Sequence, residues 1–326
     1  MTPTPDRGSG FAAGLGYVSA AYVLWGILPV YFVALAPSGP IEIVSWRIVL
    51  SLAFCILLIV ATRGWARIRG LLRDRRAMGW LALAAVLITA NWLVFVYAVD
   101  IGNVLEASLG YFINPIVSVL IGVLLLRERL RPLQWAAVAI AAVAVVTLIA
   151  FHGSFPWIAL TLACSFGIYG YVKNRTGGRV DAISGLSIET AVLTPLAIAV
   201  LGWVQLTGGI SLGQHGAWHT ALLLAAGVIT AVPLLLFAAG ARRLPLSIVG
   251  LVQFFAPVMQ FLTGWLLLGE PMPLSRWLGF GIVWVAVIVL GIDMARQIPM
   301  ARRAQRARHA DRAAEGVGRG FDNQAE

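Results

Sequence analysis

Four polar residues recur along one apolar stretch of the chain at the spacing of a single helix face. Ser108, Tyr111, Asn114 and Ser118 lie three or four residues apart, so on a helix their side chains share one side. Pro115 follows Asn114, and its ring nitrogen cannot donate the backbone hydrogen bond that a helix normally makes to the fourth residue before it. Hydroxyl and amide groups beside such a loosened turn can hold a small solute by hydrogen bonds. The pattern therefore predicts a binding site with a helix break at Pro115.

The depth of this site depends on the helix that carries it, which we expect near residues 103–126. With a rise of 1.5 Å per residue, Asn114 falls roughly 15–20 Å into this segment, near the centre of a bilayer. Polar groups at that depth are costly toward lipid and should face the interior of a helix bundle or a wet cavity. The alternative is a hydrogen bond between helices and a packing kink, with Gly110 and Gly122 allowing close approach.

A second stretch repeats the landmarks of the first at an offset of 142 residues (257 − 115). The matching pairs are Pro115 and Pro257, Gly122 and Gly264, Leu124–Leu126 and Leu266–Leu268, Glu128 and Glu270, and Trp135 and Trp277. A constant offset of this length indicates a duplicated unit. Duplicated halves with interrupted helices at matching positions often enclose a central site. Gln253 and Pro257, the latter a second helix break, are then the counterparts of the first half-site.

The composition places these helices in a membrane. The chain has 326 residues, of which 60% are hydrophobic and 12% charged, whereas a soluble domain has about 25% charged residues. Apolar runs long enough to cross a bilayer are expected at 11–35, 43–62, 78–99, 103–126, 133–150, 155–172, 185–203, 219–240, 246–268 and 276–294. The prediction is an all-α polytopic membrane protein with ten transmembrane helices.

The cations give the orientation. The net charge is +10, and Lys and Arg gather in alternate loops, at 63–76, 127–131, 173–179 and 242–243, and in the tail. The positive-inside rule then puts both termini in the cytoplasm, and it explains the basic charge without nucleic acid. A lipid-headgroup role for the tail stays open. Because five helices per half is an odd number, the halves should be two inverted five-helix repeats, at 11–150 and 151–295. They are flanked by a disordered N-terminus, 1–10, and a basic cytoplasmic tail, 296–326.

Three charged residues within the spans are candidates for coupling or gating. Arg47 and Glu189 occupy nearly equivalent positions in the two halves, so they are not expected to pair with each other. Arg47 is better placed to meet Glu106, with a structural gate or snorkelling to the headgroups as the alternative. Glu189 has no evident partner, although Lys173 or Arg242 could reach it. An unpaired carboxyl group in a low dielectric favours its protonated form, so Glu189 is the candidate proton-coupling residue, against a structural hydrogen bond.

Asn91 and Trp92 lie deep enough in the third span to line a cavity. Tyr22, Trp25 and Trp92 could form its aromatic walls, and core packing is the alternative reading. Together with Ser108, Tyr111, Asn114 and Gln253, these residues complete the predicted substrate-binding set.

Other chemistry is disfavoured. Within the spans there is no serine with a His or Lys base and no His-Glu-x-x-His motif, and the chain has no Walker A motif. An enzyme, a metal site, a cofactor and direct ATP drive are therefore not expected. Cys55 and Cys164 lie in apolar runs and are expected as free thiols.

Several of these segments also resemble a known family. The resemblance rests on Ala20–Pro29, Ser45–Arg47, Asn91–Trp92, Leu105–Pro115, Ile188–Thr190 with Pro195, Ile229–Pro233 and Gly269–Pro271. On these residues the chain is similar to the EamA branch of the drug/metabolite transporter superfamily, and within it to RarD-type permeases. Val252–Pro257 is more apolar than the family's usual version. The resemblance implies ten helices, the cytoplasmic (inner) membrane and small-molecule transport.

The function expected is a secondary transporter, or permease, that moves a small metabolite or drug-like solute by alternating access, with export as the expected direction. The alternative is a membrane channel or a solute-sensing scaffold. The expected partners are a small-molecule substrate and the lipid bilayer, with protons as the candidate coupling ion and no nucleic acid. The sequence leaves the substrate and the oligomeric state open, a homo-oligomer included.

Overall fold

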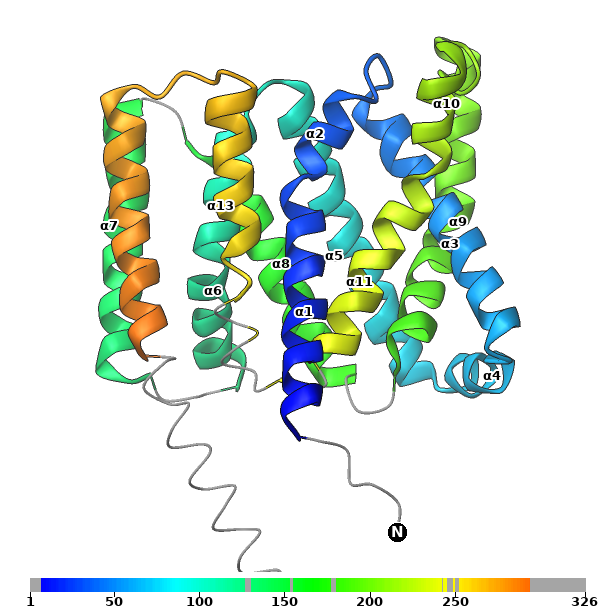
Figure 1. The fold of residues 1–326 in the computed structure, drawn as a ribbon, viewed down its shortest axis with the longest axis horizontal. Coiled ribbons are helices and arrows are strands. Elements are labelled where there is room, and N and C mark those ends of the chain that lie inside the picture. The colour runs from blue at the N-terminus through cyan, green and yellow to red at the C-terminus, as the bar shows by residue number, and fades with distance from the viewer. Residues whose placement is uncertain are drawn as a thin grey trace, which may run out of the picture.

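The structure is a computed structural model that describes residues 7–126, 130–152, 155–176, 180–241, 243–244, 249 and 252–293. This part of the chain is helical and holds no strand. Its helices are α1 (Arg7–Gly26), α2 (Leu28–Val33), α3 (Pro40–Ala61), α4 (Trp65–Arg73), α5 (Arg75–Asp100), α6 (Val104–Leu126), α7 (Pro132–His152), α8 (Trp157–Thr176), α9 (Ala182–Thr207), α10 (Gly216–Leu224), α11 (Ala226–Ala241), α13 (Phe255–Leu262), the π-helix η1 (Thr263–Leu267) and a last helix, Leu274–Asp293. The long helices stand side by side (Figure 1).

Seven helical segments among the described residues are long and apolar enough to cross a membrane, judged by length and composition. They are Phe11–Val33, Pro40–Ala61, Arg75–Asp100, Val104–Ile121, Ala182–Thr207, Gly216–Ala241 and Leu274–Asp293. Two shorter apolar helices cover Pro132–Thr147 and Phe255–Leu267. The chain is therefore an all-α polytopic membrane protein, and the count of ten crossings stays a prediction.

The outer surface of the bundle is apolar, as lipid requires. Leu57 on α3, Val86 on α5, Leu124 on α6 and Leu196 on α9 each leave more than half of their surface exposed. Single exposed apolar residues are normal in any protein, but exposed apolar side chains on so many helices would be an aggregation liability in water. This surface is therefore suited to contact with the hydrocarbon chains of a lipid bilayer.

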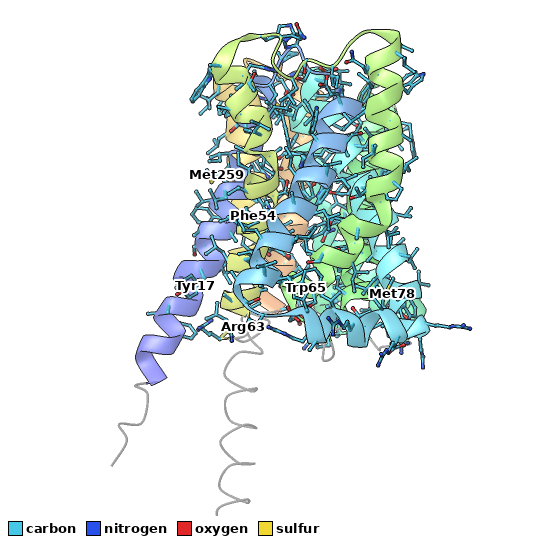
Figure 2. The ribbon with its side chains drawn as sticks, turned by 90° about the vertical axis from the view of Figure 1, so that its right-hand side faces the viewer. Tyr17, Phe54, Arg63, Trp65, Met78 and Met259 are labelled. Atoms are coloured by element: carbon cyan, nitrogen blue, oxygen red, sulfur yellow. The ribbon has the colours of Figure 1, made fainter. Side chains whose placement is uncertain are left out.

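One short helix differs from the others in direction and chemistry. The helix α4 lies across one end of the bundle, the end where α1 begins (Figure 1). It buries Ile68 and Leu71 and carries arginines at positions 67, 69 and 73, the pattern of an amphipathic helix at a membrane surface. Figure 2 shows Arg63 and Trp65 at this same end. We refer to it as the α4 end, and to the opposite one as the α2/α10 end.

The helix α9 begins at the α4 end. Asp181 precedes it, accepts a hydrogen bond from the Ser184 backbone N–H at 3.1 Å and lies 3.7 Å from an Arg67 nitrogen on α4. An aspartate at this position satisfies a backbone donor that the first turn leaves free. The helices α3 and α9 pack along each other, and α11 and α5 pack against both of them.

Neither of the two predicted helix breaks ends a helix at its proline. The helix α6 continues through Pro115, so the break predicted there does not terminate the helix. One proline removes a single backbone hydrogen bond, and the turns on either side keep theirs. Pro257 is the third residue of α13, in the first turn, where backbone donors lack helical partners anyway. The irregular part of that segment is η1, five residues of π-helix after α13.

Some of the helix crossings are so close that only glycine fits. A Cβ atom added at Gly110 on α6 would lie 2.6 Å from the carbonyl oxygen of Ala159 on α8. A Cβ atom added at Gly227 on α11 would collide with the backbone carbonyl group of Leu50 on α3. Small residues at crossings are the usual way in which helices approach closely in lipid, where the hydrophobic effect gives no drive.

We expect Gly227→Ala to lower the stability of the protein by about 1–3 kcal/mol, because the new methyl group must push α11 away from the backbone of α3. Thermal unfolding of the purified protein in detergent measures the effect. Gly202→Ala on α9 is the matched control, because a Cβ atom there meets nothing within 4 Å and alanine favours a helix by about 0.5–1 kcal/mol. Equal unfolding temperatures for the two variants would contradict the close crossing.

Candidate functional site

The buried arginine of α3 has no acidic partner among the described residues. Arg47 is 4% exposed. Its Nε donates a hydrogen bond to the Thr230 hydroxyl on α11 at 3.1 Å, and its buried Nη1 has no hydrogen-bond partner. The guanidinium lies over the ring of Trp92 at 4.4 Å and over the ring of Phe32 at 5.1 Å. Aromatic faces attract a cation by their quadrupole, so the rings offset part of the cost of burying this charge.

The expected ion pair between Arg47 and Glu106 is not formed. Glu106 instead accepts a hydrogen bond from the Ile158 backbone N–H at 3.1 Å, at the start of α8. This carboxylate lies where the first turn of a helix has free donors and a partial positive charge. Glu106 lies in the first turn of α6, whereas Arg47 lies about 10 Å into α3 and contacts Trp92 on α5 and Thr230 on α11. The structure therefore corrects the predicted pairing.

The buried glutamate of α9 does have a cationic partner. Glu189 is 2% exposed, and its Oε1 accepts a hydrogen bond from Nζ of Lys173 on α8 at 2.6 Å. The Tyr169 hydroxyl donates to the other carboxylate oxygen at 3.3 Å. Of the two partners that the sequence suggests, Lys173 is the one observed, and Arg242 lies outside the described residues. Removing one member of such a pair leaves a buried charge uncompensated.

Asn91 and Tyr111 form one hydrogen-bonded network between α5, α6 and α8. The Tyr111 hydroxyl donates to Oδ1 of Asn91 at 2.9 Å. Nδ2 of Asn91 donates to the carbonyl oxygen of Leu162 at 3.1 Å and to the Ser165 hydroxyl at 3.0 Å. The Asn91 side chain is therefore fully engaged with protein. Tyr111 is partly buried beside Phe95, with the two ring centroids 5.6 Å apart.

Asn114 and Ser108 link neighbouring helices. Nδ2 of Asn114 donates to the carbonyl oxygen of Ala163 on α8 at 3.2 Å. The Ser118 hydroxyl donates to Oδ1 of Asn114 at 3.5 Å. The Ser108 hydroxyl donates to the carbonyl oxygen of Pro257 at 3.0 Å. These contacts correspond to the helix–helix alternative for these two positions. They also join the two duplicated stretches directly, because Ser108 belongs to one and Pro257 to the other.

Tyr22 and Trp25 on α1 belong to an aromatic cluster with Phe237 on α11. Their ring centroids are 5.2 Å apart, and Phe237 lies 5.9 Å from the Tyr22 ring and 5.7 Å from that of Trp25. Tyr22 is 9% exposed. In this conformation the two residues contribute to packing, which was the alternative reading for them. Trp92 differs, because its ring carries the guanidinium of Arg47.

The buried polar residue of α13 is a glutamine that sequence reasoning missed. Gln253 lies before α13 and is partly exposed. Gln260 is 3% exposed; its Nε2 donates to the carbonyl oxygen of Trp25 at 3.2 Å, and its buried Oε1 has no partner. A signal was present, since Gln260 lies 142 residues after Ser118 (260 − 118) and so shares its place in the duplicated unit.

The α2/α10 end is closed by a network that sequence reasoning also missed. Glu42 at the start of α3 accepts hydrogen bonds from the backbone N–H and the hydroxyl of Ser211, both at 2.8 Å. The Ser211 hydroxyl lies 2.5 Å from that of Ser38, and Ser38 lies 3.0 Å from Nε2 of His219. A cavity of about 630 Å³ opens beside this network, with Glu42 and Ser211 in its lining. It lies at the end of the bundle rather than beside Asn91.

A second carboxylate closes the same end. Glu270, one of the landmark residues of the duplication, accepts hydrogen bonds from the backbone N–H groups of Val104 at 2.6 Å and Leu105 at 3.0 Å, in the first turn of α6. Burial raises the pKa of the Glu270 carboxyl, while the two N–H groups act in the opposite direction. The segment after η1 is thereby fixed to the start of α6.

No group of three or more His, Cys, Asp or Glu side chains within the described ranges could hold a metal ion. Cys55 and Cys164 are free, the first buried and the second exposed.

Exchanging the two charges tests the corrected pairing. We expect the double variant Arg47→Glu with Glu106→Arg to be no more functional than either single variant, because the residues occupy separate sites. In the double variant, an arginine would face the positive start of α8 and a carboxylate would lie on the Trp92 ring, both unfavourable. Growth complementation or transport, read beside protein abundance, gives the result. Recovery of activity in the double variant would restore the predicted ion pair.

Comparison with known proteins identifies the family. The model of the EamA-like transporter family matches residues 12–150 and again 155–292. The chain is 46% identical to Protein RarD of Streptomyces exfoliatus over 283 residues, 87% of this chain and 89% of that protein. It is 42% identical to the uncharacterized transporter YojE of Bacillus subtilis (strain 168), covering 85% of this chain and 92% of that one.

The fold is also found among solved structures. A solved crystal structure, whose chain is 19% identical in sequence to this one, matches with a TM-score of 0.56. The match covers 90% of this chain and 100% of the chain in that structure. At this identity the likeness concerns the fold alone. The two matches of the family model and the length of the aligned relatives carry the assignment: this chain belongs to the EamA-like transporter family and is a RarD-like member of it.

Proposed function

We propose that this membrane transporter is a secondary carrier that moves a small solute by alternating access, with ten crossings arranged as two inverted five-helix repeats. The observation that carries the proposal is a match between the two halves in packing and in buried charge. The uncharacterized transporter YojE and the RarD protein support transport as the general function by their names and similarity.

The packing of the helices supports the duplication. If α1 corresponds to α8, α3 to α9, α5 to α11 and α6 to α13, the most extensive helix contacts in one half have counterparts in the other. The contact of α1 with α11 matches that of α8 with α5, and the contact of α6 with α8 matches that of α13 with α1. The contacts of α3 with α9 and of α6 with α13 map onto themselves. Such exchange symmetry is expected of two copies around one axis.

The depths of the buried charges support the inversion. Arg47 comes seven residues after Pro40, where α3 begins, and Glu189 seven residues after Ala182, where α9 begins. At 1.5 Å per residue each charge lies about 10 Å from the start of its helix. Because α3 begins at the α2/α10 end and α9 at the α4 end, the two charges lie near opposite sides of the bundle.

The orientation follows from the positive-inside rule. The arginines of α4 and its neighbours support a cytoplasmic position for the α4 end, where α1 begins. The α2/α10 end, closed by Glu42, Ser211 and Glu270, then faces outward. Because these hydrogen bonds close the outward-facing end, an alternating-access cycle needs them to break when the transporter opens outward.

Glu189 is our candidate for proton coupling. Its ion pair with Lys173 reaches toward water, since the lysine side chain is 32% exposed and the carboxyl 2%. Protonation of the carboxyl would neutralise one partner, weaken the contact between α8 and α9 and bias the cytoplasmic end toward opening. A switch of this kind needs one titratable group at a movable contact between two elements. The rival reading is a purely structural ion pair.

A channel or a sensing scaffold is the alternative function, and counterflow separates them. Proteoliposomes are loaded with an unlabelled solute and placed in a solution that contains a trace of the same solute in labelled form. The solutes tested in turn are amino acids, other metabolites and amphenicols. A carrier should concentrate the label transiently and saturate, because outward and inward steps share one site. A channel gives simple equilibration, and a scaffold gives no flux. Equilibration without overshoot for a solute that crosses would contradict the carrier.

We expect Glu189→Gln to abolish the dependence of net flux on an imposed pH gradient while solute exchange continues, because an amide cannot take up or release the proton. The measurement is uptake into proteoliposomes with and without the gradient. Asp100→Asn is the control, since Asp100 is an exposed carboxylate at the end of α5. If the glutamine variant keeps the pH dependence of the original protein, Glu189 is structural.

A further inference from the structure

The two halves of the protein treat their buried charges differently. Arg47 and Glu189 lie at the same place in the duplicated unit, 142 residues apart (189 − 47), and so do Tyr31 and Lys173 (173 − 31). In the second half, Lys173 lies 2.6 Å from the Glu189 carboxylate and compensates its charge. In the first half, the position of that counter-charge is taken by the neutral Tyr31, whose hydroxyl donates to the carbonyl oxygen of Leu222 at 2.9 Å.

Arg47 is therefore a buried cation with unfilled capacity for an anion. Its contacts are a neutral hydroxyl, Thr230, and two aromatic rings, Phe32 and Trp92, and its Nη1 is buried without a partner. None of the salt bridges in the described part of the chain involves Arg47. Buried guanidinium groups are normally matched by carboxylates or phosphates through their planar fork of donors. A charge left without its partner inside a membrane protein marks a functional site.

The surroundings suit a solute with an apolar, flat body. Trp92, Phe32 and the partly buried Tyr111 come from α5, α2 and α6, and Phe95 lies within ring contact of both Phe32 and Tyr111. Both rings contact the guanidinium of Arg47 but accept no conventional hydrogen bond from it, so an anion would pair with a terminal nitrogen such as Nη1, which has no partner. Thr230 already occupies Nε, which leaves the terminal nitrogens for the ligand.

We propose that Arg47 binds the carboxylate of the transported solute, and that the substrates of this protein are small organic carboxylates with an apolar body. The inference rests on the proposed carrier function and names the substrate class of its site. In the first half, the carboxylate of the bound solute then pairs with the charge of Arg47. In the second half, Lys173 pairs with Glu189 whether or not a solute is bound. The empty and loaded carriers consequently differ in charge at this site, by which a solute can favour one conformation.

The experiment compares ligands that differ only in charge. The purified protein in neutral detergent is titrated with benzoate and benzamide, and with phenylacetate and phenylacetamide, while its thermal unfolding is followed. We expect stabilisation by the carboxylates and little by the amides, because ligands that bind the folded state raise its stability by mass action. Arg47→Gln should weaken carboxylate binding about tenfold or more, and Arg47→Lys should keep part of it, since lysine keeps the charge but loses the planar fork.

Arg276→Gln is the matched control, because Arg276 is a partly buried cation near the start of α6, where it contacts Asn103. It should bind carboxylates as the unchanged protein does. Equal stabilisation by acids and amides, or carboxylate binding by Arg47→Gln at unchanged affinity, would overturn the inference. So would stabilisation that depends on Arg47 with phosphatidylglycerol but not with the soluble acids, which would make this a lipid-headgroup site. If Arg47→Gln does not fold, the inference is still tested by the comparison of acids with amides in the unchanged protein and by carboxylate binding to Arg47→Lys.

Counterflow separates this inference from the carrier itself. Counterflow of neutral or cationic solutes alone, unaffected by Arg47→Lys, would leave the carrier standing and reject the carboxylate site. Carboxylate binding through Arg47 in a protein without counterflow would reject the carrier and keep the site.

Discussion

The cost of placing charge inside a membrane governs this structure. Isolated charges in a low dielectric are strongly unfavourable unless they are paired or hydrogen-bonded. The protein meets this constraint in two ways at matching positions. Glu189 is compensated by Lys173 and Tyr169, whereas Arg47 relies on aromatic faces and one hydroxyl. The first arrangement is self-sufficient, and the second leaves a donor for a ligand. Two stretches of the chain that match the same family model thus supply two different chemical environments.

Backbone contacts hold the frame that keeps these environments apart. Glycines at 110 and 227 let helices approach until backbone meets backbone, which fixes their relative positions without large side chains. At the helix ends, carboxylates replace the missing partners of the first turns: Glu106 at the start of α8, Glu270 at the start of α6 and Asp181 at the start of α9. Most of the acidic residues in the bundle are therefore part of its construction.

The closed α2/α10 end links this frame to transport. The hydrogen bonds among Glu42, Ser211 and Ser38 join segments that lie far apart in the sequence. Glu42 precedes Arg47 on α3 by five residues (47 − 42), about one and a half helical turns or about 7.5 Å. A solute bound at Arg47 would therefore lie near the contacts that the proposed alternating-access cycle has to open. Among Glu42, Ser211 and Ser38 the Glu42 carboxylate is the one charged group, so these contacts can separate without leaving a second charge unpaired.

The sequence by itself determined the class of protein, the repeated landmarks at a constant offset and a few of the buried polar residues, among them Arg47, Asn114 and Glu189. These follow from the length of apolar runs, a constant offset and the placement of cations, and each is a property of local composition. The tertiary structure alone decided the partners. Arg47 meets Thr230 rather than Glu106, and Gln260 rather than Gln253 is the buried amide of α13. The reason is that spacing fixes which residues share a helix face, while the rotation of each helix about its axis is set by contacts with helices distant in sequence.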